Sequence, residues 1–255
     1  MTERIARRGR ASRATEAARP GAAGRDSGSA PATAAPGEIE RPIPIPIPIP
    51  RSRDADRSRI AILAAARDEF AAHGLGGSRV DRIAARAGLN KKLIYYYFEN
   101  KEHLFREVLE EAYLQIRVAE RDLRLLDLPP EAAVRKLVEF TWHYFLAHPE
   151  FLTLLNSENL YRARHVQQSG KAKALNSPLI VELGTIVERG RLEGTFRDGA
   201  DPLQLYISIA GVCYFYLSNQ HTLSAIFGRD LVSPDALDER LTHVCDVILG
   251  YLLVG

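Results

Sequence analysis

The chain has 255 residues, 46% of them hydrophobic and 26% charged, and this composition is typical of a folded protein. Its two cysteines, Cys213 and Cys245, are too few for a disulfide framework, which favours a reduced intracellular environment. No apolar run approaches the roughly 18 residues that a membrane helix needs, and the basic N-terminus lacks the apolar part of a secretory signal. We therefore expect a cytoplasmic protein with no membrane partner.

Positive charge is concentrated in the first part of the chain. Residues 1–57 and residues 58–106 each carry a net charge of +4, whereas residues 107–255 carry −6. The overall net charge of +2 therefore conceals an asymmetry. A small basic segment ahead of a larger acidic one indicates a module that binds polyanions, joined to a second domain.

The first 57 residues have the composition of a disordered segment. They are rich in Arg, Ala, Gly, Ser and Pro, and large apolar side chains are nearly absent before Ile39. From Pro42 to Pro50, proline and isoleucine alternate without interruption, which favours a polyproline-II rod of about 28 Å. We interpret this rod as a spacer, with a specific docking motif as the alternative.

Helices are expected from Ser58 to the C-terminus, because apolar residues recur at helical spacing and proline and glycine fall near the ends. The alternation typical of strands never persists, so we expect an all-α protein of about nine helices. The expected helices cover residues 58–74, 78–87, 90–98, 101–127, 130–148, 151–168, 178–193, 202–223 and 234–253.

The second and third of these helices form a helix-turn-helix pattern. Ser78 is expected to begin the second helix, with Asp81 completing an imperfect capping box. Gly88 ends that helix in a tight turn, and Asn90 caps a third helix that ends near Phe98. Two short helices separated by a glycine-containing turn are typical of a DNA-binding motif.

A more specific pattern surrounds this motif. Its positions are Ala65-Ala66, Phe70, Gly74, Ile83-Ala84, Ala87-Gly88, Ile94-Tyr95, Tyr97-Phe98 and Lys101-Glu102. In order and spacing, these residues resemble the N-terminal DNA-binding domain of the TetR family of transcriptional regulators. Two positions depart from the family pattern: Lys92 stands where a small residue is common, and Glu69 stands where an apolar residue is preferred.

The resemblance implies an architecture and a function. After the segment 1–57, residues 58–106 would be a three-helix DNA-binding domain, and residues 107–255 a larger helical domain for effector binding and dimerisation. The protein would be a sequence-specific transcriptional regulator, a repressor that a small-molecule effector releases from DNA. The alternative is a DNA-binding protein without a small effector, whose C-terminal domain binds a protein partner.

The third helix carries the expected contacts with double-stranded DNA. A single helix fits the major groove, and polar and basic side chains at its N-terminus suit base edges and phosphates. Tyr97 is interpreted as a core aromatic, and Arg82 and Arg86 as either DNA contacts or a solvated helix face. The expected DNA-binding residues are Ser78, Arg79, Asn90, Lys91, Lys92, Tyr95, Tyr96 and Lys101.

The resemblance implies that the last two helices, near 202–223 and 234–253, dimerise as a four-helix bundle. Regulators of this kind bind pseudo-palindromic operators as two-fold dimers. These helices carry more apolar residues than one face requires, and the alternative is burial within a monomer. The residues are Leu203, Tyr206, Ile207, Val212, Phe215, Leu241, Val244, Ile248 and Leu252.

The resemblance also implies an effector pocket among the middle helices. Glu158, Arg162 and His165 would share one face of a helix, either toward a small polar or anionic molecule or as an exposed ion pair within the helix. Residues 151–168 also resemble family members that control the breakdown of nitrogen heterocycles. The expected effector-binding residues are Trp142, Phe145, Asn156, Asn159, Arg162 and His165.

An enzyme is not expected. The histidines and cysteines have no zinc-ligand spacing, and neither a nucleophile elbow nor a P-loop is present. The glycines from Gly74 to Gly77 end a helix and follow no strand, so they do not form a dinucleotide-binding turn. No metal and no cofactor are expected.

Overall fold

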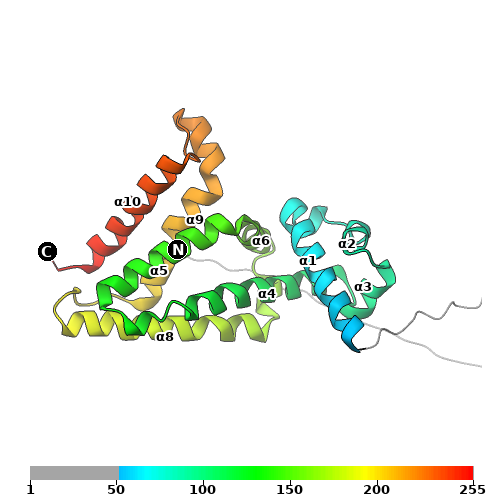
Figure 1. Cartoon of the computed structure of the whole chain (residues 1–255), viewed down its shortest axis with the longest axis horizontal. Helices are drawn as coiled ribbons and strands as arrows, with labels where there is room; N and C mark the ends of the chain where they lie inside the picture. Colours follow the sequence, from blue (N-terminus) through cyan, green and yellow to red (C-terminus); the bar gives the residue numbers. More distant parts are fainter. Residues whose placement is uncertain (1–51, 255) are drawn as a thin grey trace, which may run out of the picture. The chain divides into compact units, whose positions relative to one another are not determined.

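The computed structural model describes residues 52–254, with the side chains of residues 52, 53 and 172–177 left out. The expectations for residues 1–51, including the proline-isoleucine spacer, lie outside the described residues. Within the described range the fold is all-α, as predicted, and its one β-bridge joins Phe196 to Leu253 (Figure 1). No helix in this range is long and apolar enough to cross a bilayer.

Ten α-helices and one 3-10 turn follow one another along the described chain. They are α1 (Ser52–Gly77), α2 (Val80–Ala87), α3 (Lys91–Phe98), α4 (Lys101–Arg121), η1 (Leu125–Asp127), α5 (Pro130–Ala147), α6 (Pro149–Leu160), α7 (Arg164–Gln167), α8 (Gly170–Leu192), α9 (Pro202–Phe227) and α10 (Pro234–Leu252). The first six residues of α1 belong to the segment 1–57, which was expected to be disordered, and α4 runs through the expected domain boundary at residue 106.

The helices α1, α2 and α3 form the predicted helix-turn-helix unit. Helical geometry in α1 is interrupted at Gly74, whose φ of +62° suits glycine, and α2 ends at Gly88 with φ of +67°. Asn90 caps α3 as predicted, because its side chain accepts a hydrogen bond from the N–H of Lys92. Ile94 and Phe98 are buried on the inner face of α3 and hold its orientation.

The prediction that Ser78 begins α2 is wrong. The helix begins at Val80, and the Ser78 hydroxyl donates back to the carbonyl of Leu75, so it leaves the amides of α2 uncapped. The N–H of Arg79 instead donates to Glu69 Oε1 at 3.0 Å. A carboxylate from α1 therefore binds the backbone just before α2, a contact that a local sequence pattern does not reveal.

Three other helix boundaries differ from the prediction. The helix expected over residues 101–127 ends at Arg121, and Arg124 adopts φ of +51° before η1. The helix expected over 151–168 is broken between α6 and α7, where Arg162 and Ala163 have positive φ. Pro178 lies inside α8, which already begins at Gly170, so this proline does not mark a helix start.

The break after α6 has a physical cause in a buried carboxylate. Glu158 Oε1 accepts hydrogen bonds from the N–H groups of His165 at 2.7 Å and Val166 at 2.9 Å. These amides belong to the first turn of α7, where helical amides have no partner within their own helix. Glu158 therefore stabilises a separate helix start in place of a continuous helix.

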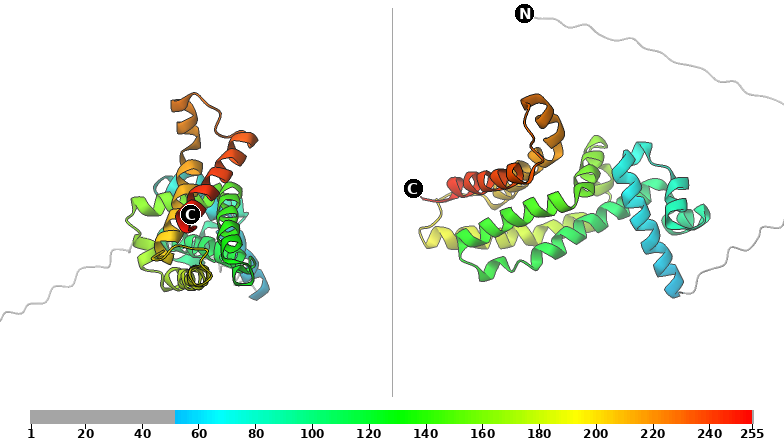
Figure 2. Two further views of the ribbon diagram at one scale, coloured as in Figure 1. Left: turned by 90° about the vertical axis from the view of Figure 1, so that its left-hand side faces the viewer. Right: turned by 45° about the horizontal axis from the view of Figure 1, so that its top comes forward.

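The C-terminal helices pack around a core that includes Trp142 and Leu183. Helix α5 contacts α8, α9 and α10, and α4 contacts α8. The predicted starts of α9 and α10 are confirmed, since Asp201 and Ser233 cap them through their side chains. The last turns of α9 project beyond the neighbouring helices in all views (Figures 1 and 2).

Candidate nucleic-acid interface and ligand pocket

The N-terminal end of α3 presents an exposed polar and aromatic surface. Asn90, Lys91 and Lys92 are all exposed, and Tyr95 and Tyr96 follow on the next turn with 44% and 64% of their surfaces exposed. Arg79, just before α2, is also exposed. Six of the eight expected DNA-binding residues therefore lie on the surface of the helix-turn-helix unit.

One of these residues already has an anionic partner. Lys91 Nζ lies 2.7 Å from Asp81 Oδ1, and this contact links α3 to the first turn of α2. The hydrogen bond between the two groups raises the pKa of Lys91 and lowers the pKa of Asp81. Lys91 is thus charged, and a phosphate would compete with Asp81 for it.

Ser78 and Lys101 are engaged inside the protein. Ser78 is buried, and Lys101 Nζ donates to the carbonyls of Leu75 at 2.7 Å and of Ser78 at 3.2 Å. Lys101, the first residue of α4, thus holds the turn between α1 and α2 from outside, while the Ser78 hydroxyl donates to Leu75 within the turn. In this arrangement they stabilise the turn that precedes α2, and their predicted contacts with phosphate stay a prediction.

The sequence pattern did not assign a role to Glu69, which is almost completely buried in α1. Besides binding the N–H of Arg79, its Oε1 accepts a hydrogen bond from Arg82 Nε at 2.6 Å. Burial raises the pKa of Glu69, but the hydrogen bonds and charges of Arg79, Arg82 and His73 outweigh it, so the net shift is downward. The sequence does carry a signal for this role, because a glutamate at a position that is usually apolar needs polar partners when it is buried.

Tyr97, Arg82 and Arg86 all make contacts within the helix-turn-helix unit. Tyr97 is half-buried and packs against the core. Arg82 binds Glu69 and the carbonyl of Gly77, and Arg86 lies 3.2 Å from Asp68. Arg82 is therefore more than a solvated helix face, because it ties α2 to α1.

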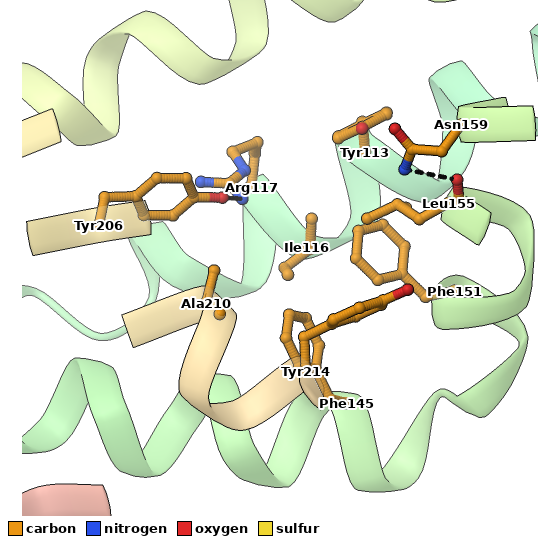
Figure 3. Close-up of a pocket in the computed structure, with 11 residues that line it drawn as sticks. Tyr113, Ile116, Arg117, Phe145, Phe151, Leu155, Asn159, Tyr206, Ala210 and Tyr214 are labelled. Atoms are coloured by element: carbon orange, nitrogen blue, oxygen red, sulfur yellow. Dashed lines mark hydrogen bonds between the residues drawn. The ribbon is translucent and has the colours of Figure 1, made fainter. Parts of the chain in front are cut away.

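A cavity of about 400 Å³ lies among α4, α5, α6 and α9, and we call it the central pocket (Figure 3). Many of the lining side chains are aromatic, and the rings of Phe145 and Phe151 are stacked with their centroids 5.9 Å apart. Helix α6 contributes residues at a spacing of four, so one of its faces lines the cavity. The lining residues are Tyr113, Ile116, Arg117, Phe145, Phe151, Leu155, Asn159, Tyr206, Ala210, Gly211 and Tyr214.

A charged pair lies at one end of the central pocket. Arg117 is 4% exposed, and its Nη2 donates to the hydroxyl of Tyr206 at 2.9 Å (Figure 3). Its Nη1 lies 2.6 Å from Glu120 Oε2, one turn further along α4. Burial raises the pKa of Glu120; Arg117 lowers it and Glu182 raises it, and the result is about 7.

The expected effector residues are only partly brought together. Phe145 and Asn159 line the central pocket, and Asn156 accepts a hydrogen bond from the pocket residue Tyr214. Trp142 is instead buried in the core beside Tyr216, away from the lining.

The predicted shared face of Glu158, Arg162 and His165 is wrong, because the helix ends before Arg162 reaches it. Arg162 is exposed. Glu158 and His165 do form an ion pair at 2.7 Å, but it is buried and joins α6 to α7, so the alternative of an exposed pair within one helix is also wrong.

The residues that sequence reasoning missed are Arg117 and the tyrosines around it. Tyr113, Arg117 and Glu120 recur at helical spacing together with the buried Ile116, so the inner stripe of α4 includes a charged pair. Charges at core positions signal either an ion pair or a binding site. The sequence pattern places Tyr206 among the expected dimerisation residues and gives Tyr214 no role, and only the structure identifies both as pocket residues of α9.

Comparison with known proteins identifies the family of the two parts of the chain. Residues 62–108 match the family described as bacterial regulatory proteins, tetR family, and residues 130–248 match the tetracyclin repressor-like C-terminal domain. The HTH-type transcriptional repressor NicS of Pseudomonas putida is 42% identical over 188 residues, which cover 74% of this chain and 89% of NicS. The HTH-type transcriptional regulator RutR of Escherichia coli is 27% identical over 191 residues, covering 74% and 87%.

Solved structures share the fold. A TetR family transcription regulator from Marinobacter aquaeolei superposes with a TM-score of 0.59 at 20% identity, covering 80% of this chain and 100% of its own. The fatty acid degradation regulator FadR of Bacillus halodurans superposes with a TM-score of 0.54 at 19% identity, covering 75% and 97%. Because the match to NicS at 42% identity spans most of both chains, this chain belongs to the TetR family of DNA-binding transcriptional regulators.

Proposed function

We propose that this protein is a cytoplasmic repressor that binds a pseudo-palindromic operator as a homodimer and leaves it when a small molecule fills the central pocket. The observation that carries the proposal is the position of α6. Its residues Phe151, Leu155 and Asn159 line the pocket, while Ser157 on another face accepts a hydrogen bond from the N–H of Leu75 at 3.2 Å. One helix therefore contacts both the effector site and the turn that leads into α2.

The DNA contacts are assigned to the exposed end of α3. We propose that Asn90, Lys91, Lys92, Tyr95 and Tyr96 face the major groove and its flanking phosphates. Arg79 lies at the start of α2, where an exposed arginine can reach the adjacent phosphate backbone. Ser78 and Lys101 act by holding the turn between α1 and α2.

The dimer is assigned to the outer faces of α9 and α10. Part of the apolar set expected from sequence is buried within the subunit, namely Val244, Ile248 and Leu252. Another part is exposed on α9, where Ile207 and Phe215 have 51% and 58% of their surfaces accessible. Large apolar side chains exposed in a row on terminal helices favour association with a second copy. The exposed residues are Leu203, Ile207, Phe215, Ile226, Phe227, Val247 and Tyr251.

Release from DNA requires a change in the distance between the two recognition helices of the dimer. A dimer fits two half-sites about 34–36 Å apart, and only conformers with matching recognition helices bind both. An occupant of the central pocket that displaces α6 would move the turn at Leu75 and change the distance between the recognition helices. Because binding free energies are reciprocal, operator DNA must weaken effector binding by the same factor.

The central pocket favours this mechanism over a protein-binding C-terminal domain without an effector. It offers a cavity of about 400 Å³ lined by aromatic rings and a few polar groups, which is typical of a small-molecule site. The expectation that the effector is a nitrogen heterocycle stays a prediction, and calorimetry with uracil as a first probe tests it.

The decisive experiment is fluorescence anisotropy with labelled DNA from the region upstream of the coding sequence. Tight binding of this fragment, with scrambled DNA of equal length bound weakly, is expected for an autoregulated repressor. Equal and steeply salt-dependent binding of both fragments would contradict a specific site in that region. A variant lacking residues 1–50 shows whether the basic N-terminal segment contributes the non-specific part.

A further inference from the structure

Arg117 is a buried cation that is incompletely paired inside the central pocket. Its Nη2 donates to Tyr206, and its guanidinium lies 5.5 Å from the centre of the Tyr206 ring. Its Nε has no hydrogen-bond partner among the described residues, and Nη1 approaches Glu120 Oε2 without the alignment of a hydrogen bond. A guanidinium with 4% exposure cannot satisfy these donors with bulk water, so the site has unused capacity for an acceptor.

The groups facing this pair do not neutralise Arg117 completely. Glu120 on α4 is its nearest anion, and burial together with Glu182 on α8 favours the protonated form of that carboxyl, with a pKa of about 7. Tyr144 on α5 also faces Glu120, and burial keeps its hydroxyl protonated by raising its pKa. Tyr113 and Tyr206 add hydroxyl groups on the pocket side. At neutral pH the end of the pocket near Arg117 therefore carries excess positive charge.

Aromatic rings form most of the rest of the pocket, and Asn159 and the tyrosine hydroxyls are its polar groups. Phe145 and Phe151 are stacked, and Tyr113 meets Phe151 edge to face with centroids 5.8 Å apart. Figure 3 shows the rings of Phe145, Phe151 and Tyr214 gathered at a distance from Arg117 and Tyr206, with Ile116 between the two groups. One end thus suits a negative group and the other suits a ring.

We propose that the central pocket binds a small aromatic monocarboxylate, with the carboxylate at Arg117 and Tyr206 and the ring among Phe145, Phe151 and Tyr214. This assignment rests on the proposed function only in taking the pocket as the effector site. A planar guanidinium fork matches carboxylate geometry, and a ligand cation would be repelled by Arg117. Arg117 is the one charged residue among the described residues that line the cavity, which favours one negative charge over two.

Binding of such an anion has a consequence for Glu120. A second negative charge near Arg117 favours the protonated Glu120 carboxyl, because like charges disfavour ionisation. Binding therefore takes up protons, and the affinity should rise as the pH is lowered from about 8 to about 6. The Glu120→Gln variant removes this pH dependence.

Isothermal titration calorimetry on the full chain tests the assignment, with benzoate and 2-naphthoate as probes and benzamide and 2-naphthamide as neutral counterparts. We expect Arg117→Gln to weaken carboxylate binding by about 10- to 100-fold, the range for hydrogen bonds to a charged group. The matched control is Arg121→Gln, an exposed arginine one turn further along α4, which should change nothing. The double variant Arg117→Gln/Glu120→Gln removes both charges, so no buried charge is left alone if the single variant unfolds.

The outcomes separate this inference from the proposed function. Equal binding of 2-naphthamide and 2-naphthoate, or binding of 2-naphthoate that is unchanged in both Arg117 variants, would overturn the carboxylate assignment. Failure of both carboxylates to bind the wild type overturns it as well. A neutral compound that releases operator DNA would leave the proposed function intact while the inference fails. Carboxylate binding that depends on Arg117 but never releases operator DNA would support the inference and contradict the proposed function.

Discussion

At the scale of one residue, the buried side chain of Glu69 stabilises the helix-turn-helix unit from inside the protein. Its carboxylate binds the backbone of Arg79 and the side chain of Arg82, so it joins α1 to the N-terminus of α2. The sequence marks Glu69 as a departure from the family pattern, and the structure supplies the two partners that make a buried carboxylate tolerable.

The first prediction concerns this carboxylate. Glu69→Leu restores the apolar residue common in the family but leaves the Arg79 N–H without its acceptor, so it should lower the free energy of unfolding by about 1–3 kcal/mol. Urea unfolding followed by circular dichroism measures this loss. Asp68→Asn, at an exposed neighbouring position, is the control and should change stability little. A Glu69→Leu protein as stable as wild type would show that the hydrogen bonds contribute nothing net.

The second prediction concerns Asp81, which pairs with Lys91 on the surface that we propose faces DNA. Asp81→Asn removes a negative charge and frees Lys91 for phosphate, so affinity for DNA should increase about two- to fivefold at low salt. Anisotropy titrations at several salt concentrations measure the change. Weaker binding by Asp81→Asn would indicate that Asp81 is needed to orient Lys91.

The third prediction is a pH dependence set by Glu120. Its pKa is raised to about 7 in the folded protein from an ordinary value of 4.5, so the folded state binds the proton more tightly than the unfolded state. Stability therefore falls as the pH rises between these two values, by roughly 3 kcal/mol at 1.4 kcal/mol per unit. Denaturant unfolding from pH 4.5 to pH 8 should show wild type losing stability relative to Glu120→Gln. A constant difference between the two proteins would contradict the raised pKa.

At the scale of elements, two faces of α6 make different contacts. Phe151, Leu155 and Asn159 face the central pocket, while Ser157 and Glu158 bind backbone groups at Leu75 and α7. Helix α1 packs against α6 as well as against α4, so two elements connect the C-terminal helices to the helix-turn-helix unit. We therefore expect a small displacement of α6 to move the turn at Gly74 as well.

The fourth prediction tests this connection. Ser157→Ala removes the acceptor for the Leu75 N–H, so the same effector occupancy should release less operator DNA, while operator affinity without effector changes little. Anisotropy titrations with and without an effector measure the ratio of the two affinities, which we expect to shrink several-fold. Thr153→Ala, which removes a hydroxyl bonded within α6 itself, is the matched control. An unchanged ratio in Ser157→Ala would place the coupling in α4 alone.

At the scale of the whole molecule, association of two copies decides whether DNA can be read specifically. One helix-turn-helix unit covers too few base pairs, so a second unit at fixed spacing is required. The exposed apolar residues of α9 and α10 are the surface on which the proposed dimer depends.

The fifth prediction follows from that surface. Phe215→Glu places a charge in the proposed interface, so the protein should become monomeric and lose about 100-fold or more in operator affinity. Size-exclusion chromatography with light scattering and anisotropy measure the two effects. Leu160→Glu, at a side chain 84% exposed on α6, is the control and should leave both unchanged. A dimeric Phe215→Glu protein would move the interface to another face.

The local parts of the fold could be predicted because their signals lie within a few residues of each other. Asn90, Asp201 and Ser233 cap helices through amides two or three residues away, and Gly88 ends α2 with its own backbone conformation. The errors at Ser78 and between α6 and α7 have one cause. In both places a buried carboxylate from another helix accepts a hydrogen bond from a backbone N–H at the start of a helix, and Glu69 and Glu158 act over distances that local patterns do not cover.

The sequence by itself determined the all-α class, the helix-turn-helix and the family, because helical periodicity, capping and a family motif are written in neighbouring residues. Only the tertiary structure decided which side chains share a cavity and which link the pocket to the DNA-binding unit. Arg117 and Tyr206 are 89 residues apart in sequence, and Leu75 and Ser157 are 82 apart, yet each pair shares a hydrogen bond. Contacts of this kind arise when amphipathic helices bury their apolar faces together, and the polar residues among those faces must then find partners in the other helices.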